Sequence, residues 1–218
     1  MQSTLERLAY WFLRLNGFMT TCNFVVHPET PDANGNYVQQ TDVDVLAVRF
    51  PHRLENRVRP MVDHPAVVDD SAIQLVLAET KSGVCSLNKA WTEPERENYQ
   101  KILSSAGVVP REQVQAVAAA LCVNGEWSGA GIRVRLFCFG KRANRTLQRR
   151  YPAIAQMSWR DDVLPFVFER FNGQIEEKRL HEQWDDDARA LFRAMIGTDG
   201  TLDALDAVVE VIAPDEGP

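Results

Sequence analysis

The sequence predicts an α/β fold in which a mixed sheet is flanked by helices and followed by a helical C-terminal extension. Two patterns support this prediction. Up to residue 150, apolar or alternating segments that favour strands are interspersed with segments of helical periodicity. Beyond Tyr151 the strand pattern disappears and helical periodicity remains. With 218 residues, of which 45% are hydrophobic, the chain is long enough to bury a core.

A helix is expected first, from about residue 4 to about residue 16. Ser3 and Glu6 match the S-x-x-E pattern of a capping box, in which side chains bond the free backbone N–H groups of the first turn. Gly17 follows as the expected C-terminal cap. Between these ends, apolar residues recur at helical spacing, namely Leu5, Leu8, Phe12 and Leu15.

Three strands are expected next. Residues 22–27 form a short β-branched segment, and residues 28–36, rich in Pro, Asp, Asn and Gly, are typical of a hairpin-like connection. Longer apolar strands are expected at residues 41–50 and 73–81. Residues 51–71 between them are polar and contain three prolines, which predicts a long loop.

Two helices and a fourth strand complete the predicted core. The helices are expected at residues 93–105 and 111–122, the first ended by Gly107 and the second begun by Pro110. Alternating residues at 132–139 predict the strand. We therefore assign residues 1–150 to a core domain.

Residues 151–218 are predicted to form an acidic, aromatic-rich extension. Helices are expected at residues 158–171, 186–196 and 202–212. The extension has enough apolar surface that it should pack on the sheet or on another chain. Its large aromatic residues are Trp159, Phe166, Phe168, Phe171, Trp184 and Phe192.

Charge is distributed unevenly along the chain. Lys and Arg number 18 against 15 Asp and Glu in residues 1–150, but 6 against 15 in residues 151–218. Only residues 1–150 therefore carry the net positive charge needed to face a phosphate backbone. The four cysteines have neither disulfide-framework nor zinc-site spacing. Because no apolar stretch is long enough to cross a bilayer, we expect a cytoplasmic protein.

Acidic side chains stand at unusual places on two of the predicted strands. On the third strand an apolar face through Leu75 and Leu77 ends in Glu79 and Lys81, which share its parity. Leaving such charges at the edge of a core without partners costs several kcal/mol. On the second strand Asp44, with Asp42 before it, shares a face with apolar residues. If the two strands pair, the acids converge at one end of the sheet.

A divalent cation would resolve the repulsion between these acids. Oxygen ligands from Asp44, Glu79 and a backbone carbonyl, with Thr80 as the candidate, suit Mg²⁺ with waters completing the octahedron. Alternatively, these charged residues have only a structural role and form an ion-pair cluster at a sheet edge. Asp42 could take part in the site or simply meet a nearby base such as Arg49.

The run Asp44-Val45-Leu46-Ala47, followed on the next strand by Glu79-Thr80-Lys81, resembles the D…(E)xK signature of the PD-(D/E)XK, or restriction-endonuclease-like, superfamily. The order of elements over residues 4–140 also resembles its αβββαβ core. Three departures accompany the resemblance: no proline precedes Asp44, the two acids are 35 residues apart, and the Q-x-x-x-Y pattern of the RecB-like branch is missing.

The resemblance implies a metal-dependent nuclease that hydrolyses phosphodiester bonds, with DNA as the expected substrate. Asp44 and Glu79 would bind Mg²⁺, for which Mn²⁺ is the expected substitute, and Lys81 would orient or activate the attacking water. Glu6 matches a glutamate that many members place on the first helix; capping of that helix is the alternative role. A homodimer, or a partner protein bound through the C-terminal helices, is consistent with this class.

Two other functions stay open. The fold could be a catalytically inactive module for DNA binding or protein assembly, or a metal-free hydrolase that uses Glu79 and Lys81 as an acid–base pair. A basic stretch that follows the fourth strand could grip phosphates beside the site, or could be a solvated face that pairs with the acidic extension. The basic residues proposed to contact nucleic acid are Arg133, Arg135, Lys141, Arg142 and Arg145.

Overall fold

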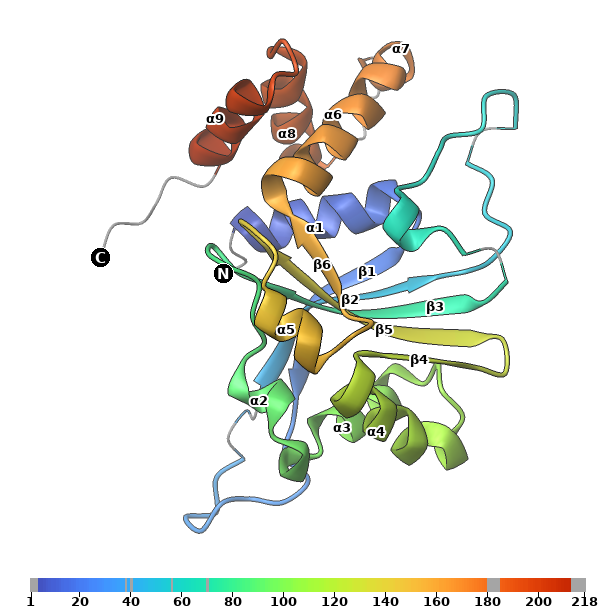
Figure 1. Ribbon diagram of the computed structural model, residues 1–218, viewed down its shortest axis with the longest axis vertical. Coiled ribbons are helices and arrows are strands. Elements are labelled where there is room, and N and C mark those ends of the chain that lie inside the picture. The colour runs from blue at the N-terminus through green and yellow to red at the C-terminus, as the bar shows by residue number, and fades with distance from the viewer. Residues whose placement is uncertain are drawn as a thin grey trace.

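A six-stranded mixed sheet forms the centre of the computed structural model, with helices on both faces (Figure 1). The structure describes residues 4–37, 39, 41–55, 57–69, 71–179 and 185–212. Ser3 and Trp184, which entered the predictions above, lie outside these residues. Within the described residues, no helix is both long and apolar enough to cross a membrane.

The strands are arranged in the order β1-β2-β3-β5-β4, and β6 also pairs with β5. The first three form an antiparallel meander, whereas β5 runs parallel to β3 and β6 runs parallel to β5. The strands are β1 (Met19–Val26), β2 (Thr41–Arg49), β3 (Ile73–Thr80), β4 (Glu126–Gly129), β5 (Ile132–Gly140) and β6 (Ala155–Ser158).

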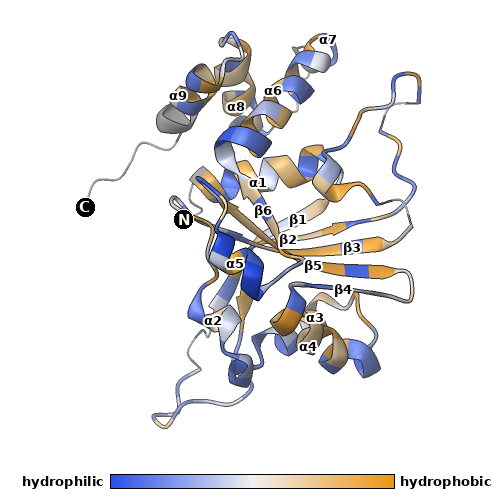
Figure 2. Cartoon of the chain, viewed as in Figure 1, coloured by the Kyte–Doolittle hydropathy of each residue, from blue (hydrophilic) through white to orange (hydrophobic). Residues whose placement is uncertain are grey.

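Two hydrophobic clusters pack on the two faces of the sheet. One contains Val76 and Phe139 with helices α1 (Thr4–Leu15) and α6 (Leu164–Gly173). The other contains Leu75, Leu77, Val134 and Leu136 with the helices of the opposite layer. Apolar residues are concentrated along the central strands (Figure 2). The helices of the opposite layer are α2 (Lys89–Thr92), α3 (Asn98–Ala106) and α4 (Val114–Asn124).

The remaining α-helices follow β5. A π-helical turn, Trp159–Val163, leads from β6 into α6. Short 3-10 helices occur at Pro65–Val67, Pro94–Arg96 and Arg111–Gln113. The other helices are α5 (Arg145–Arg150), α7 (Ile175–Arg179), α8 (Asp186–Ile196) and α9 (Leu202–Ile212).

Strand structure continues beyond Tyr151, so the prediction that it stops there is wrong. The four residues of β6 pair with Phe137–Gly140 of β5. Their sequence, Ala-Gln-Met-Ser, is too short and too mixed in polarity to give a period of two. Strand β4 was also missed; it forms a hairpin with β5 through Ala130 and Gly131, both with positive φ.

The helix expected at residues 93–105 is interrupted. Helix α2 ends before Pro94, a 3-10 helix follows, and α3 begins only after Glu97, whose φ of 56° is left-handed. Strand β1 begins at Met19, three residues before the expected start. The other predicted helices and strands occur within a few residues of their expected bounds.

The C-terminal extension packs on the same sheet face as α1. Trp159, Phe166 and Phe171 belong to the cluster that contains Phe12 and Phe139. The ring of Trp159 stacks on that of Phe139 with centroids 5.5 Å apart, and Phe166 meets the edge of Phe12 at 5.2 Å. The extension therefore shares one core with the strands.

We expect Phe12→Ala to lower the free energy of unfolding by about 3–5 kcal/mol, because Phe12 is fully buried and joins α1 to both the sheet and α6. Denaturant titration would measure this. Val123→Ala is the control: Val123 is 72% exposed, so the change should stay within about 0.5 kcal/mol. Equal effects of the two substitutions would contradict the described core.

Candidate active site

The register of β2 and β3 brings Asp44 and Glu79 to the same end of the sheet. Val45 pairs with Ala78 in this antiparallel ladder. Asp44 and Glu79 are the next residues beyond this last pair, and the charge of Asp44 acts on the carboxyl group of Glu79. Residues directly opposite each other in antiparallel strands project on the same face. The two acids predicted from the sequence are therefore neighbours across the strands.

Asp44 is held by the backbone and side chain of Thr80. Its Oδ2 accepts a hydrogen bond from the Thr80 backbone N at 2.6 Å and another from Thr80 Oγ1 at 2.8 Å. Bonds to a charged oxygen are among the stronger protein hydrogen bonds. Thr80 therefore fixes the orientation of the Asp44 carboxylate at the end of the ladder.

Glu79 is a buried carboxyl group with two donors. It is only 3% exposed. Its Oε2 accepts a hydrogen bond from Trp91 Nε1 at 3.0 Å, and its Oε1 accepts one from Lys81 Nζ. Burial and the nearby charge of Asp44 raise the pKa of Glu79 to about 7, although Lys81 and Trp91 act in the opposite direction. Near neutral pH the metal-free carboxyl group is thus divided between its protonated and ionised forms.

Lys81 is fixed at both its side chain and its backbone. Its Nζ also donates to Asn88 Oδ1 at 3.0 Å. Its carbonyl accepts from Trp159 Nε1 at 3.0 Å, and its backbone N donates to the Phe139 carbonyl at 2.9 Å. The Lys81 side chain keeps 23% of its surface exposed, so the amine can meet a ligand from solvent.

Two buried thiols hold the loop that follows Lys81. Cys85 Sγ donates to the Cys138 carbonyl and Cys138 Sγ donates to the Ser86 carbonyl, each at 3.3 Å. All four cysteines of the chain lie in its described part, and none forms a disulfide. The pairing of Cys138 with Glu79 in the β3–β5 register places these thiols next to the acidic strand end.

Glu6 extends from a different layer of the structure. It lies half-buried in the first turn of α1, which covers the sheet face opposite to Trp91. Glu79 directs its carboxylate toward Trp91 on the α2–α4 side. Asp42 is half-buried on β2, two residues before Asp44. Of the site residues predicted from the sequence, Asp44, Thr80 and Lys81 therefore form a compact group around Glu79.

Arg133 and Arg135 lie on β5 away from its Glu79 end. Arg133 pairs with Gln74 near the start of β3, and Arg135 pairs with Val76 in the middle of that strand. Arg133 forms ion pairs with Glu126 at 3.0 Å and with Asp69 at 3.3 Å. Arg135 is buried and pairs with Glu126 at 3.2 Å. The structure therefore does not bring these two arginines beside Lys81.

Lys141, Arg142 and Arg145 lie at the same end as Glu79, and all three are exposed. Lys141 directly follows β5, and its backbone N bonds the Gly83 carbonyl. Arg142 forms an isolated parallel bridge with Val84. These contacts place the start of the basic stretch against the loop after Lys81.

Trp91 and Asn88 were missed from the sequence. Trp91 lies twelve positions after Glu79, in a polar segment without the periodicity of a strand or a long helix. A buried indole requires an acceptor for its N–H. The presence of a tryptophan shortly after an acid without an obvious partner was the one signal in the sequence for this contact. Asn88 is the residue before α2, a position that its residue type favours.

The donor set fits Mg²⁺ in type. Within the described residues, no group of three or more His, Cys, Asp and Glu side chains could hold a metal ion. Mg²⁺, however, is usually bound in proteins by one or two carboxylates and several waters. Asp44 and Glu79 supply two such carboxylates, and the raised pKa of Glu79 marks a site where added positive charge is favourable.

Comparisons with protein-family models, curated proteins and solved structures found no match. A function for this chain is therefore inferred from the geometry of these residues and from their chemistry.

We expect the stability of the metal-free protein to fall as the pH rises between about 4.5 and about 7, through Glu79. Because its folded pKa is above the ordinary value of 4.5, the folded state binds the proton more tightly in this window. Glu79→Gln removes this contribution. Relative to wild type, the variant should gain up to about 3 kcal/mol between about pH 4.5 and pH 7.

Urea unfolding of both proteins across this pH range would measure the difference, with Glu112→Gln on the exposed 3-10 helix as the control. Parallel pH profiles for wild type and Glu79→Gln would show that Glu79 does not titrate in this window.

Proposed function

We propose that this protein is a magnesium-dependent nuclease of the PD-(D/E)XK type that hydrolyses phosphodiester bonds in DNA. One observation carries the proposal: Asp44 and Glu79 stand close together just beyond the last pair of the β2–β3 ladder, and Lys81 donates to Glu79. Two hard oxygen donors and an amine at one strand end are the functional groups that this chemistry requires.

The order of elements supports the assignment. A helix, an antiparallel three-stranded meander, further helices, the short strand β4 and a strand parallel to β3 follow one another along the chain, and the sheet order is β1-β2-β3-β5-β4. This agrees with the αβββαβ order that the D…(E)xK resemblance implies. In that arrangement, β2 and β3 are the strands expected to carry the acids and the lysine.

In this proposal Asp44 and Glu79 bind the metal ion, while the neighbouring residues position them. Bound Mg²⁺ would offset the phosphate charge and lower the pKa of a water molecule. Thr80 orients Asp44, and Trp91 orients Glu79 through its indole N–H. Lys81 provides a cation that can stabilise negative charge developing on the phosphate and can hold the attacking water.

The exposed basic residues beside the site support a nucleic-acid substrate. Lys141, Arg142 and Arg145 follow β5 at the acidic strand end and can contact phosphates on either side of the cleaved bond. Lys89, exposed at the start of α2 directly after Asn88, adds another cation near Lys81. DNA is chosen over RNA because the resembled superfamily acts mainly on DNA.

A catalytically inactive module is the second candidate. Both oxygens of Glu79 already accept hydrogen bonds, one from Lys81 and one from Trp91. A carboxylate engaged in this way has less capacity for a metal ion. In the alternative function, the same fold would bind DNA or assemble with a protein without cleaving a substrate.

Plasmid cleavage with Mg²⁺ tests the nuclease assignment. We expect Lys81→Ala and Glu79→Gln each to reduce the cleavage rate by about 100-fold or more, because each removes a group that acts on the reacting phosphate. Glu112→Gln should cleave as wild type does, since Glu112 is exposed on a 3-10 helix. Equal cleavage by all four proteins would attribute the activity to a contaminant and end the assignment.

A metal titration separates the two candidate functions. We expect Mn²⁺ or Mg²⁺ to stabilise the wild type by about 2.7 kcal/mol when the metal is about 100-fold above its Kd. Thermal unfolding with and without metal would measure this, and Asp44→Asn should abolish the response. Identical thermal unfolding with and without millimolar metal would support the inactive module.

A further inference from the structure

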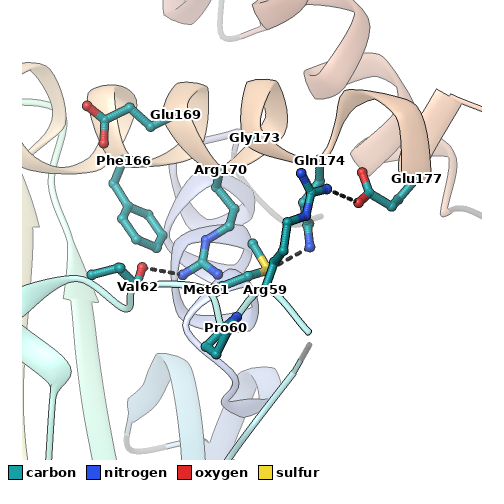
Figure 3. A pocket seen from close by; sticks show the side chains of 10 residues that line it. All are labelled: Arg59, Pro60, Met61, Val62, Phe166, Glu169, Arg170, Gly173, Gln174 and Glu177. Atoms are coloured by element: carbon teal, nitrogen blue, oxygen red, sulfur yellow. Dashed lines mark hydrogen bonds and ion pairs between the residues drawn. The ribbon is translucent and has the colours of Figure 1, made fainter. Parts of the chain in front are cut away.

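A pocket lies at the opposite end of the strands from Asp44 and Glu79. It has a volume of about 300 Å³ and is formed between residues 59–62 and the helices α6 and α7 (Figure 3). Residues 59–62 belong to the connection that leaves β2 after Arg49 and enters β3 at Ile73. A volume of this size suits a small molecule.

One wall of the pocket contains a buried arginine whose hydrogen-bonding capacity is only partly used. Arg170 on α6 is 5% exposed. Its Nη2 donates to the Val62 carbonyl at 2.8 Å and to Asp63 Oδ1 at 3.2 Å. Its Nη1 is buried and has no hydrogen-bond partner among the described residues; Glu55 Oε2 is 3.9 Å away. A buried donor left unsatisfied is costly and needs an explanation.

The charge of Arg170 is incompletely neutralised by its surroundings. Asp63 is shared among three guanidinium groups, those of Arg49 at 2.6 Å, Arg53 at 2.9 Å and Arg170 at 3.2 Å. Glu55 adds a second carboxylate, which pairs with Arg53 and lies 3.9 Å from Arg170, so two carboxylates face three cations, and burial strengthens the remaining positive field. An anion placed in the pocket would therefore be attracted to the Nη1 side of Arg170.

A second polar atom of the pocket also lacks a partner. Gln174 lies one turn after Arg170, and its Oε1 is buried without a donor among the described residues. Its Nε2 lies 2.6 Å from the weak acceptor Met61 Sδ. Rotation of the amide by 180° exchanges oxygen and nitrogen. That rotation would put an N–H donor where the unpartnered oxygen is, and so a second donor for an anion.

The rest of the pocket is largely apolar. Phe166, Met61 and Pro60 line it, and the ring centroid of Phe166 is 4.9 Å from Arg170 Cζ. The two acidic residues at its rim do not oppose an anion strongly. Glu177 is paired with Arg59 at 2.5 Å, and Glu169 points away from Arg170 (Figure 3).

We propose that this pocket binds a small organic carboxylate with an apolar body. The carboxylate would bond Arg170 Nη1 and the Gln174 amide, and its carbon body would lie against Phe166 and Met61. An inorganic anion would leave the apolar wall without a contact. This site is separate from the proposed nuclease centre, and its existence does not depend on that activity.

Phenylacetate is a suitable probe, with the neutral phenylacetamide as its isosteric control. The 218-residue chain carries five methionines, so methyl-¹³C methionine labelling gives few signals. Met61→Leu identifies the signal of Met61. We expect phenylacetate to shift this signal saturably at millimolar concentration, and phenylacetamide to bind roughly tenfold or more weakly because it lacks the charge.

Two variants test the location. Arg170→Gln should weaken binding roughly tenfold or more, but its loss of buried ion pairs could also unfold the chain. Gly173→Leu avoids this problem, because a Cβ at this pocket-lining position meets no atom within 4 Å. It should block phenylacetate, whereas Asn172→Leu, at the neighbouring exposed position outside the pocket lining, should bind as wild type does.

Three results would overturn the proposal. These are no saturable shift of the Met61 signal with phenylacetate, equal affinity for phenylacetamide, and unchanged binding by folded Gly173→Leu. Because the readout is binding at a methionine remote from Asp44 and Glu79, none of these results bears on nuclease activity, and failure of plasmid cleavage leaves this test intact.

Discussion

The antiparallel pairing of β2 with β3 is the constraint on which the candidate active site depends. Val45 lies opposite Ala78 within a ladder whose side chains are buried on both faces. A slip of one residue would turn the apolar side chains of β2 from one layer into the other, so the packing of the two hydrophobic clusters enforces the register. The position of Asp44 and Glu79 just beyond the end of the same ladder is a consequence of that packing.

The electrostatics of the site follow from the same register. Two acids at one strand end repel each other, and the protein offsets this with Lys81, the Trp91 indole and the Thr80 donors. The compensation is incomplete, because the pKa of Glu79 is still raised to about 7. The ion pairs around Glu126 are more fully matched: Glu126 lies between Arg133 and Arg135, with Asp69 adding to Arg133.

The central strands and the acids they carry could be predicted because local pattern determines them. Alternation on β3 assigns Glu79 and Lys81 to one face, and an antiparallel neighbour must bring Asp44 to the same end. The hydrogen-bond partners of Glu79 and Lys81 could not be predicted in this way. Trp91 and Asn88 reach the site through a loop and a one-turn helix whose path depends on tertiary contacts.

The roles of Arg133 and Arg135 show a different limit of sequence reasoning. A run of basic residues at 133–150 looks continuous in the sequence, but β5 carries its first members to one end of the sheet and its later members to the other. Their acidic partners come from β4 and from the loop before β3. Strand β6 was missed for a related reason, since its pairing with β5 is tertiary and its four residues carry no clear period.

The hydrogen bond from Trp159 to the Lys81 carbonyl makes the C-terminal extension part of the support for the acidic strand end. The indole of Trp159 also stacks on Phe139, the residue before the last one of β5. Proteolytic cleavage between residues 150 and 159 would therefore free a tether of the Lys81 backbone as well as remove a covering layer. A homologous chain shortened at that point would need another group to hold the same carbonyl.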